Sequence, residues 1–262
     1  MIPPTSSTAD RRRRQLLARI HRRFETITEP VHVGGLTLSF TRVADPNKVL
    51  DDVAAEEDRR DKLAGQRRPG DELHLPYWAE LWDSSLAIIE FLAETLPNRF
   101  DVPTLSVLDL GCGMGLTGTM AAALGARVTF ADLEPEALLF ARLNAVDYEE
   151  RIRTRRLNWH TARLTEQFDL IIGADILYDK TQWQHLEPFW RGHLRAGGSV
   201  LLGEPGRQTG DLFLDWIKPL PWALEQMKKT VPTRTAPIRL FQLTPRACGD
   251  ARAARIFSPC QS

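Results

Sequence analysis

Three glycines alternate with other residues directly after a short apolar run. Residues 107–115 read Val-Leu-Asp-Leu-Gly-Cys-Gly-Met-Gly, which places glycine at Gly111, Gly113 and Gly115. Glycine adopts backbone conformations that other residues resist, and it lets a ligand approach without meeting a Cβ. A helix expected to begin near Leu116 would point free N–H groups and its positive dipole end at this loop. The pattern predicts a strand, a loop for a nucleotide-type cofactor, and a helix.

Strand-like and helix-like segments alternate from residue 104 onward. We expect strands near 104–110, 127–132, 153–157, 168–173, 198–203, 222–229 and 238–243, and helices near 115–124, 134–148, 182–195 and 209–217. Such alternation implies right-handed crossovers and a parallel sheet between two layers of helices. Only a few residues join the last two strands, so these should form a hairpin. The predicted fold class is α/β, a doubly wound, mostly parallel seven-stranded sheet with an antiparallel C-terminal hairpin.

The chain before this region is predicted to be an extension, residues 1–72, in front of one domain at residues 73–262. We expect a basic helix capped by Thr8 or Asp10, and then a small hairpin around Gly34-Gly35. The charged stretch 51–72 is interpreted as a helix end with a mobile loop, either a lid or a linker. Apolar residues at 78, 82, 86, 89, 92 and 96 predict a further helix that ends before Pro97.

Charge and cysteine content exclude several classes of protein. The 34 basic and 34 acidic residues balance, so no overall field attracts the chain to nucleic acid or to a membrane surface. Three cysteines without a CxxC pair, and histidines without metal-ligand spacing, predict neither a disulfide scaffold nor a metal site. We expect a cytoplasmic protein. The arginine-rich start also fits a mitochondrial transit peptide, which would place the protein in the matrix, or a contact with an acidic partner.

Polar and aromatic residues follow the predicted strands at the edge where ligands bind in such sheets. Asp132 lies 21 positions beyond Gly111 and ends the second strand, where a carboxylate can accept hydrogen bonds from both hydroxyls of a ribose. Asn158 and Trp159 follow the third strand, and the indole is placed to lie against an adenine ring. Together these residues are expected to bind a whole nucleoside, its ribose and its adenine.

Two cofactors compete for this loop. Residues 113–118 fit the dinucleotide pattern GxGxxG, which would bind NAD, and residues 109–115 fit DxGxGxG, the loop of S-adenosylmethionine enzymes. Asp109 favours the second cofactor, because a carboxylate repels a pyrophosphate but suits a ligand with an ammonium group and a cationic sulfur. The closing hairpin also argues against a second mononucleotide-binding half.

The chain resembles the class I, seven-stranded S-adenosylmethionine-dependent methyltransferases over about residues 73–245. It looks most like the protein-lysine methyltransferases that include the enzyme acting on the electron transfer flavoprotein β subunit. The residues that carry the resemblance are 76–82, 84–85, 107–118, 130–132, 134–138, 158–159 and 173–178. The resemblance implies S-adenosylmethionine as cofactor, S-adenosylhomocysteine as product, and a protein substrate that carries the target lysine. Asn158 departs from the family, where many relatives carry an acid.

The resemblance assigns roles to residues in this numbering. The candidate cofactor-binding residues are Trp82, Asp109, Gly111, Cys112, Gly113, Gly115, Asp132, Leu133, Asn158, Trp159 and Ala174. The candidate catalytic residues, in a DxxY pattern at the target-nitrogen side, are Asp175 and Tyr178.

The chemistry of methyl transfer fits this DxxY pattern. A lysine arrives protonated and must lose its proton, and a carboxylate can fix the direction of its nitrogen while an aromatic ring offers a cation–π contact. Alternatively, Asp175 only caps a turn and Tyr178 only packs. Ile176-Leu177 does not supply the Pro-Pro slot of nucleic-acid adenine methyltransferases. We expect a monomeric lysine methyltransferase that binds no nucleic acid and no membrane. A small-molecule N- or O-methyltransferase and a non-catalytic cofactor-binding protein remain open.

Overall fold

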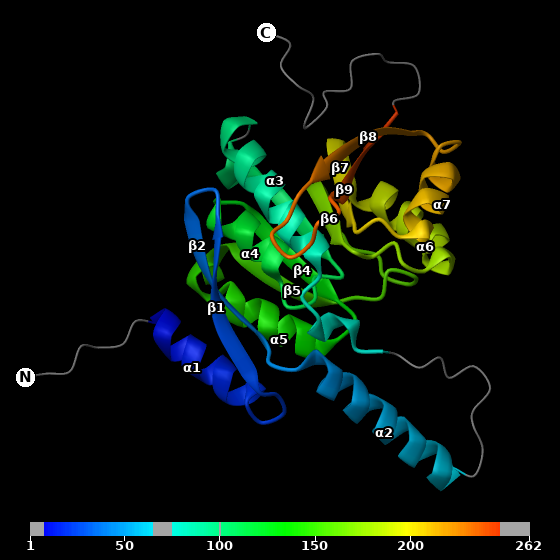
Figure 1. Ribbon diagram of the computed structural model, residues 1–262. Coiled ribbons are helices and arrows are strands. Elements are labelled where there is room, and N and C mark those ends of the chain that lie inside the picture. The colour runs from blue at the N-terminus through cyan, green and yellow to red at the C-terminus, as the bar shows by residue number, and fades with distance from the viewer. Residues whose placement is uncertain (1–7, 65–74, 100, 247–262) are drawn as a thin grey trace, which may run out of the picture.

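A computed structural model describes residues 8–64, 75–99 and 101–246. A sheet of seven strands lies at its centre (Figure 1). The strand order is β5-β4-β3-β6-β7-β9-β8, and the last two strands pair antiparallel. The strands are β3 (Ser106–Leu110), β4 (Arg127–Asp132), β5 (Ile152–Arg156), β6 (Phe168–Ala174), β7 (Leu194–Glu204), β8 (Trp222–Lys229) and β9 (Ile238–Pro245). The predicted fold class and the closing hairpin are confirmed.

Helices cover both faces of this sheet. Successive residues of a strand point to opposite faces, and in the central strands both sets are apolar, so each face is buried under helices. One face packs on α3 (Asp83–Arg99), α4 (Leu116–Ala123) and α5 (Pro135–Asn144), and the other on α6 (Lys180–His193) and α7 (Gln208–Ile217). Val107 belongs to the first core and its neighbour Leu108 to the second. Short 3₁₀ turns complete the domain at η1 (Tyr77–Ala79), η2 (Val102–Thr104) and η3 (Val146–Arg151).

The N-terminal part packs against α5 and shares a core with it. This part consists of α1 (Thr8–Ile20), the hairpin of β1 (Thr26–Val33) and β2 (Leu36–Val43), and α2 (Pro46–Ala64). Leu16 and Ile20 of α1 are buried in a cluster with Phe140 of α5. The hairpin and the basic helix are as predicted, and α1 is a packed element of the fold.

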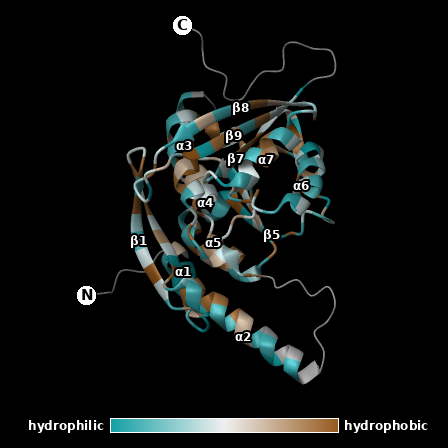
Figure 2. Ribbon diagram, turned by 45° about the vertical axis from the view of Figure 1, so that its right-hand side comes forward, coloured by the Kyte–Doolittle hydropathy of each residue, from teal (hydrophilic) through white to brown (hydrophobic). Residues whose placement is uncertain are grey.

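Three elements differ from the sequence-based predictions. Residues 51–64 continue α2, which carries both hydrophilic and hydrophobic residues and extends away from the sheet (Figures 1 and 2). The remainder of the predicted loop, 65–72, lies outside the described residues. Helix α3 begins at Asp83, after the 3₁₀ turn that holds Trp78, and runs through Pro97. Proline is tolerated there because only the last turn loses a hydrogen bond.

The predicted helix 134–148 is two elements. Helix α5 ends at Asn144, and the chain continues as the 3₁₀ turn η3. The Asn144 side chain donates to the carbonyls of Thr41 and Met114 and accepts from the Thr41 N–H, so it ties the end of the helix to β2. Within the described ranges, no helix is long and apolar enough to cross a membrane.

Candidate active site

A cavity of about 360 Å³ lies at the carboxyl ends of β3, β4 and β6, next to the glycine loop. This is the edge at which a doubly wound sheet binds its ligands. The predicted site residues that line it are Trp82, Gly111, Cys112, Gly113, Gly115, Asp132, Leu133, Asn158, Trp159, Ala174, Asp175 and Tyr178. The fold therefore brings together residues that are almost 100 positions apart in the chain.

The glycine loop has the backbone conformation that its sequence predicts. Gly111, Gly113 and Gly115 have φ of +64°, +51° and +82°, a region that side chains rarely adopt. A Cβ at Gly115 would lie 2.6 Å from the Cβ of Ala141 in α5. The turn therefore requires all three glycines, and at Gly115 the packing of α5 against the loop requires glycine as well.

Asp132 closes the loop from β4. Its Oδ2 accepts a hydrogen bond from the backbone N–H of Gly113 at 2.9 Å, and its Oδ1 accepts one from the backbone N–H of Glu134 at 3.0 Å. Burial raises the pKa of this carboxyl, and the two backbone bonds oppose the rise. A carboxylate oxygen has room for a second donor, so Asp132 can serve the loop and a ligand together.

Asp109 lies behind the loop and does not line the cavity. It is 1% exposed, and it accepts hydrogen bonds from the Thr117 hydroxyl and the Gly118 N–H, each at 2.8 Å. Burial raises its pKa to about 7. This corrects the expectation that its carboxylate faces the ligand: the strand turns Asp109 toward α4, and it anchors the start of that helix. Its charge is therefore no argument for the cofactor.

A polar network fixes the indole of Trp159, which lines the cavity close to Gly111. Trp159 Nε1 donates to Gln182 Oε1 at 3.0 Å, and His160 lies 2.6 Å from the same oxygen. The carboxamide of Asn158 accepts the His160 N–H at 2.9 Å, which shapes the turn after β5. Gln182 and His160 also line the cavity. Gln182 comes from helix α6, and no pattern in the sequence predicts it as a site residue.

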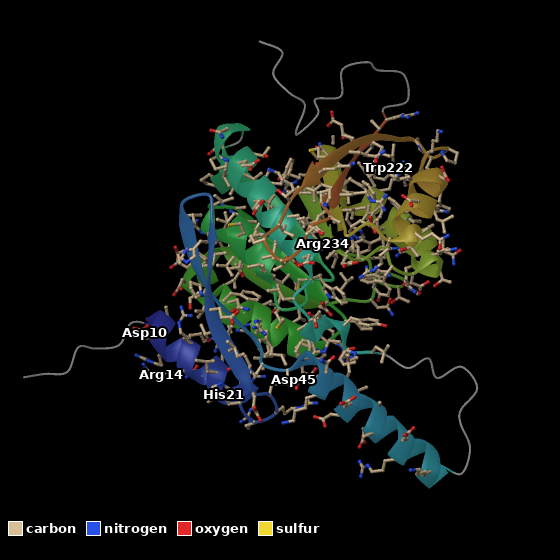
Figure 3. All side chains as sticks on the ribbon, in the orientation of Figure 1. Asp10, Arg14, His21, Asp45, Trp222 and Arg234 are labelled. Atoms are coloured by element: carbon tan, nitrogen blue, oxygen red, sulfur yellow. The ribbon has the colours of Figure 1, made fainter. Side chains whose placement is uncertain are left out.

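Asp175 stands at the boundary of two cavities. A second cavity of about 330 Å³ shares Trp82 and Asp175 with the first, and its other lining residues are Asp83, Pro205, Gly206, Arg207 and Arg234. Figure 3 labels Arg234 on the connection between β8 and β9. Asp175 has φ of +59°, is 7% exposed, and forms an ion pair with Arg207. The turn at residues 204–207 therefore lies beside Asp175, since its Gly206 and Arg207 line the second cavity.

Aromatic rings surround this boundary. The ring of Tyr178 is 46% exposed and lies 5.5 Å from that of Tyr77, which lies 6.2 Å from that of Trp82. Burial raises the pKa of the Tyr178 phenol, so its hydroxyl is a donor at neutral pH. Burial also raises the pKa of the Cys112 thiol well above its usual value, which leaves it unreactive.

The first cavity is acidic. Five carboxyl groups line it, and no lysine or arginine does among the described residues; the acids are Glu80, Asp132, Glu134, Asp175 and Asp179. Such a lining favours a ligand with positive charge and opposes a pyrophosphate. This distribution answers the question between the two cofactors: it fits the ammonium and sulfonium of S-adenosylmethionine and opposes NAD.

A family model and two curated relatives that match this chain are all described as lysine methyltransferases. A family model described as lysine methyltransferase matches residues 77–218. Protein N-lysine methyltransferase METTL21A of Xenopus tropicalis is 36% identical over 133 residues, 47% of this chain and 58% of that protein. The electron transfer flavoprotein beta subunit lysine methyltransferase of Mus musculus is 33% identical over 138 residues, 50% of this chain and 51% of that protein. The chain thus spans about half the length of these curated relatives.

The fold also has solved counterparts. The glycopeptide N-methyltransferase MtfA superposes with a TM-score of 0.53 at 15% identity, covering 63% of this chain and 91% of that one. At this level of identity the likeness concerns the fold alone.

Proposed function

Because the chain belongs to the lysine methyltransferase family, we propose that it transfers a methyl group from S-adenosylmethionine to the side-chain nitrogen of a lysine in a protein substrate. One observation carries this proposal: an acidic cavity that fits the cofactor meets a second cavity at Asp175 and Trp82. A donor in the first cavity and an acceptor in the second would therefore meet beside Asp175 and Trp82.

The first cavity is the proposed cofactor site. Asp132 would hold the ribose hydroxyls, Trp159 would lie beside the adenine, and the amino end of α4 would face the carboxylate of the methionine part. When bound, S-adenosylmethionine supplies an electrophilic methyl group, whose C–S bond breaks with its electron pair on sulfur as the N–C bond forms. The acidic lining favours the positive charges of this ligand.

The second cavity is the proposed entrance for the lysine. Asp175 accepts a hydrogen bond from the incoming ammonium and directs its nitrogen. Tyr178 lines the first cavity, and there it offers a ring face and a hydroxyl to a nitrogen that has reached Asp175. Alignment of the nitrogen supplies most of the rate, and the proton goes to water. Asp175 orients the nitrogen rather than acting as a strong base, since a carboxylate is poorly matched to an amine of pKa near 10.4.

Further parts of the proposal concern partners and location. The described residues of one chain line both cavities, and we propose a monomer. The balanced charge supports a protein substrate over nucleic acid or a membrane. The cytoplasm is the proposed compartment.

Labelling with tritiated S-adenosylmethionine tests the function. The protein is incubated with the labelled cofactor and either purified electron transfer flavoprotein or a fractionated lysate. Label in a protein band supports the proposal. Label only in the small-molecule pool indicates a small-molecule methyltransferase, and no label in any fraction indicates a non-catalytic protein; either result overturns it.

A further inference from the structure

Arg207 contacts both residues that separate the two cavities. Its guanidinium pairs with Oδ1 of Asp175, and its Cζ lies 5.4 Å from the ring centroid of Trp82. Arg207 lines the second cavity and is absent from the lining of the first. The guanidinium therefore stands on the acceptor side of Asp175.

The backbone of Arg207 is held by a buried ion pair. Glu204 is 2% exposed and accepts hydrogen bonds from the Gly206 N–H at 2.9 Å and from Arg239 Nε at 2.7 Å. It also accepts the N–H of Arg207, whose carbonyl accepts from Arg239 Nη2 at 3.1 Å. The backbone of the turn that carries Arg207 is thus preorganised, and from this backbone the guanidinium reaches Asp175.

Other charged groups around Asp175 come from several elements. Asp83 lies at the start of α3, Glu204 at the end of β7, and both oppose the ionised form of Asp175. Arg234, on the β8–β9 connection, lines the second cavity, and Tyr178 lines the first. Among the described residues, Arg207 is the cation that forms an ion pair with Asp175.

We propose that Arg207 is a positioning residue of the acceptor site, which holds Asp175 through Oδ1, leaves Oδ2 to the lysine nitrogen, and disfavours the charged form of that amine. This inference rests on the proposed function. A guanidinium stays protonated at all working pH values, whereas a lysine must lose its proton to water before its lone pair can attack. Like charges a few ångströms apart shift an amine pKa downward by about 1 to 2 units.

The test compares Arg207→Met with a matched control, Arg191→Met. Arg191 also pairs with a carboxylate, Glu187, and lies 5.0 Å over a tryptophan ring, that of Trp222, but it lines neither cavity. Both variants should bind S-adenosylhomocysteine like the wild type in calorimetry. The acceptor is the lysate protein, or the flavoprotein, that the wild type labels in the experiment above.

In R207M, the midpoint of the rise of kcat with pH should move up by about 1 unit, with kcat near pH 7 about 10-fold lower. A ¹³C NMR titration without substrate should show a higher pKa for Asp175. R191M should move neither quantity, and Arg207→Lys should restore the profile.

An unmoved kcat profile in an active R207M overturns the inference, as does an unmoved Asp175 pKa. If R207M is inactive at every pH, R207K decides: restored turnover supports a fixed cation, and lost turnover contradicts it. If the wild type labels no protein, the proposed function is wrong. The NMR titration still tests whether Arg207 lowers the pKa of Asp175, because it needs no substrate.

Discussion

Asp175 has a left-handed backbone, and this narrows the substitutions that can test its role. Asparagine tolerates φ near +59°, whereas alanine is strained there. Asp175→Asn should keep the fold and bind S-adenosylhomocysteine within about two-fold of wild type, yet lower turnover by about 100-fold or more, since the nitrogen is no longer directed by a charge. Calorimetry and single-turnover labelling measure the two effects. Normal turnover in this variant would show that Asp175 only caps its turn.

Asp132 connects the glycine loop to the proposed ribose site. Asp132→Ala removes the acceptor of the Gly113 N–H and the charge that faces the cavity. We expect affinity for S-adenosylhomocysteine to fall by about 10- to 100-fold, the scale of a lost charged hydrogen bond. Calorimetry measures the affinity, with circular dichroism as the check of folding. Unchanged affinity would remove the ribose role.

Asp109 should make stability depend on pH. Its pKa is raised from 3.8 to about 7, so the folded state holds the proton more tightly than the unfolded state. The group therefore favours folding fully below about pH 4, and this contribution is lost as pH rises to about 7. Asp109→Asn mimics the neutral carboxyl. The free energy of unfolding of wild type minus that of D109N should fall by roughly 2–3 kcal/mol between pH 5 and 8 in urea titrations. A pH-independent difference would contradict the assignment.

At the scale of elements, the glycine loop owes part of its sequence to the packing of α4 on α5. Gly115→Ala strains a residue at φ +82° and places its Cβ 2.6 Å from Ala141. Together these effects should cost about 2–5 kcal/mol of unfolding free energy. The control is Gly35→Ala, at φ +77° with open space around it, which should cost only about 1–2 kcal/mol. Equal losses in urea denaturation would mean that the contact with α5 is unimportant.

Helix α1 is stabilised by its apolar residues rather than its arginines. Ile20 is fully buried, so Ile20→Ala should lower the free energy of unfolding by about 2–4 kcal/mol. Arg13 pairs with Asp147 at 2.6 Å, but both side chains are partly exposed, and Arg13→Ala should cost under about 1 kcal/mol. Thermal and urea denaturation compare the two. An unchanged free energy of unfolding in I20A would indicate that the packing of α1 does not stabilise the fold.

Most elements were predictable because periodicity and turn residues act locally. The strand and hairpin positions follow from apolar runs bounded by glycine, proline and polar residues. The misplaced end of α5 has a tertiary cause. Asn144 ends α5 by bonding to Thr41, which lies 103 positions earlier, and no local pattern reports such a contact.

At the scale of the whole molecule, sheet order determines which residues meet. Strands β3, β4 and β6 end at one edge, so the glycine loop, Asp132 and Asp175 converge as the sequence predicts. Their roles in binding and catalysis stay predictions. The direction in which a side chain points at that edge is harder to predict from the sequence. Asp109 points behind the loop, because a strand residue faces either the ligand or the neighbouring helix.

No local pattern in the sequence marks Arg207 as a neighbour of Asp175. It lies 32 positions after Asp175 on a different strand end, and a Glu-Pro-Gly-Arg turn is common in loops. Only the pairing of the β6 and β7 ends brings its guanidinium to the carboxylate. Such long-range ion pairs follow from topology and are not encoded in any local spacing.

The identity of the methylated amino acid tests the central claim most directly. Protein labelled by wild type with tritiated S-adenosylmethionine is hydrolysed in acid, and the labelled amino acids are separated by chromatography. The account predicts label in methyllysine, with none from D175N. Label in methylarginine or methylhistidine, or label lost as volatile methanol from a methyl ester, would contradict it.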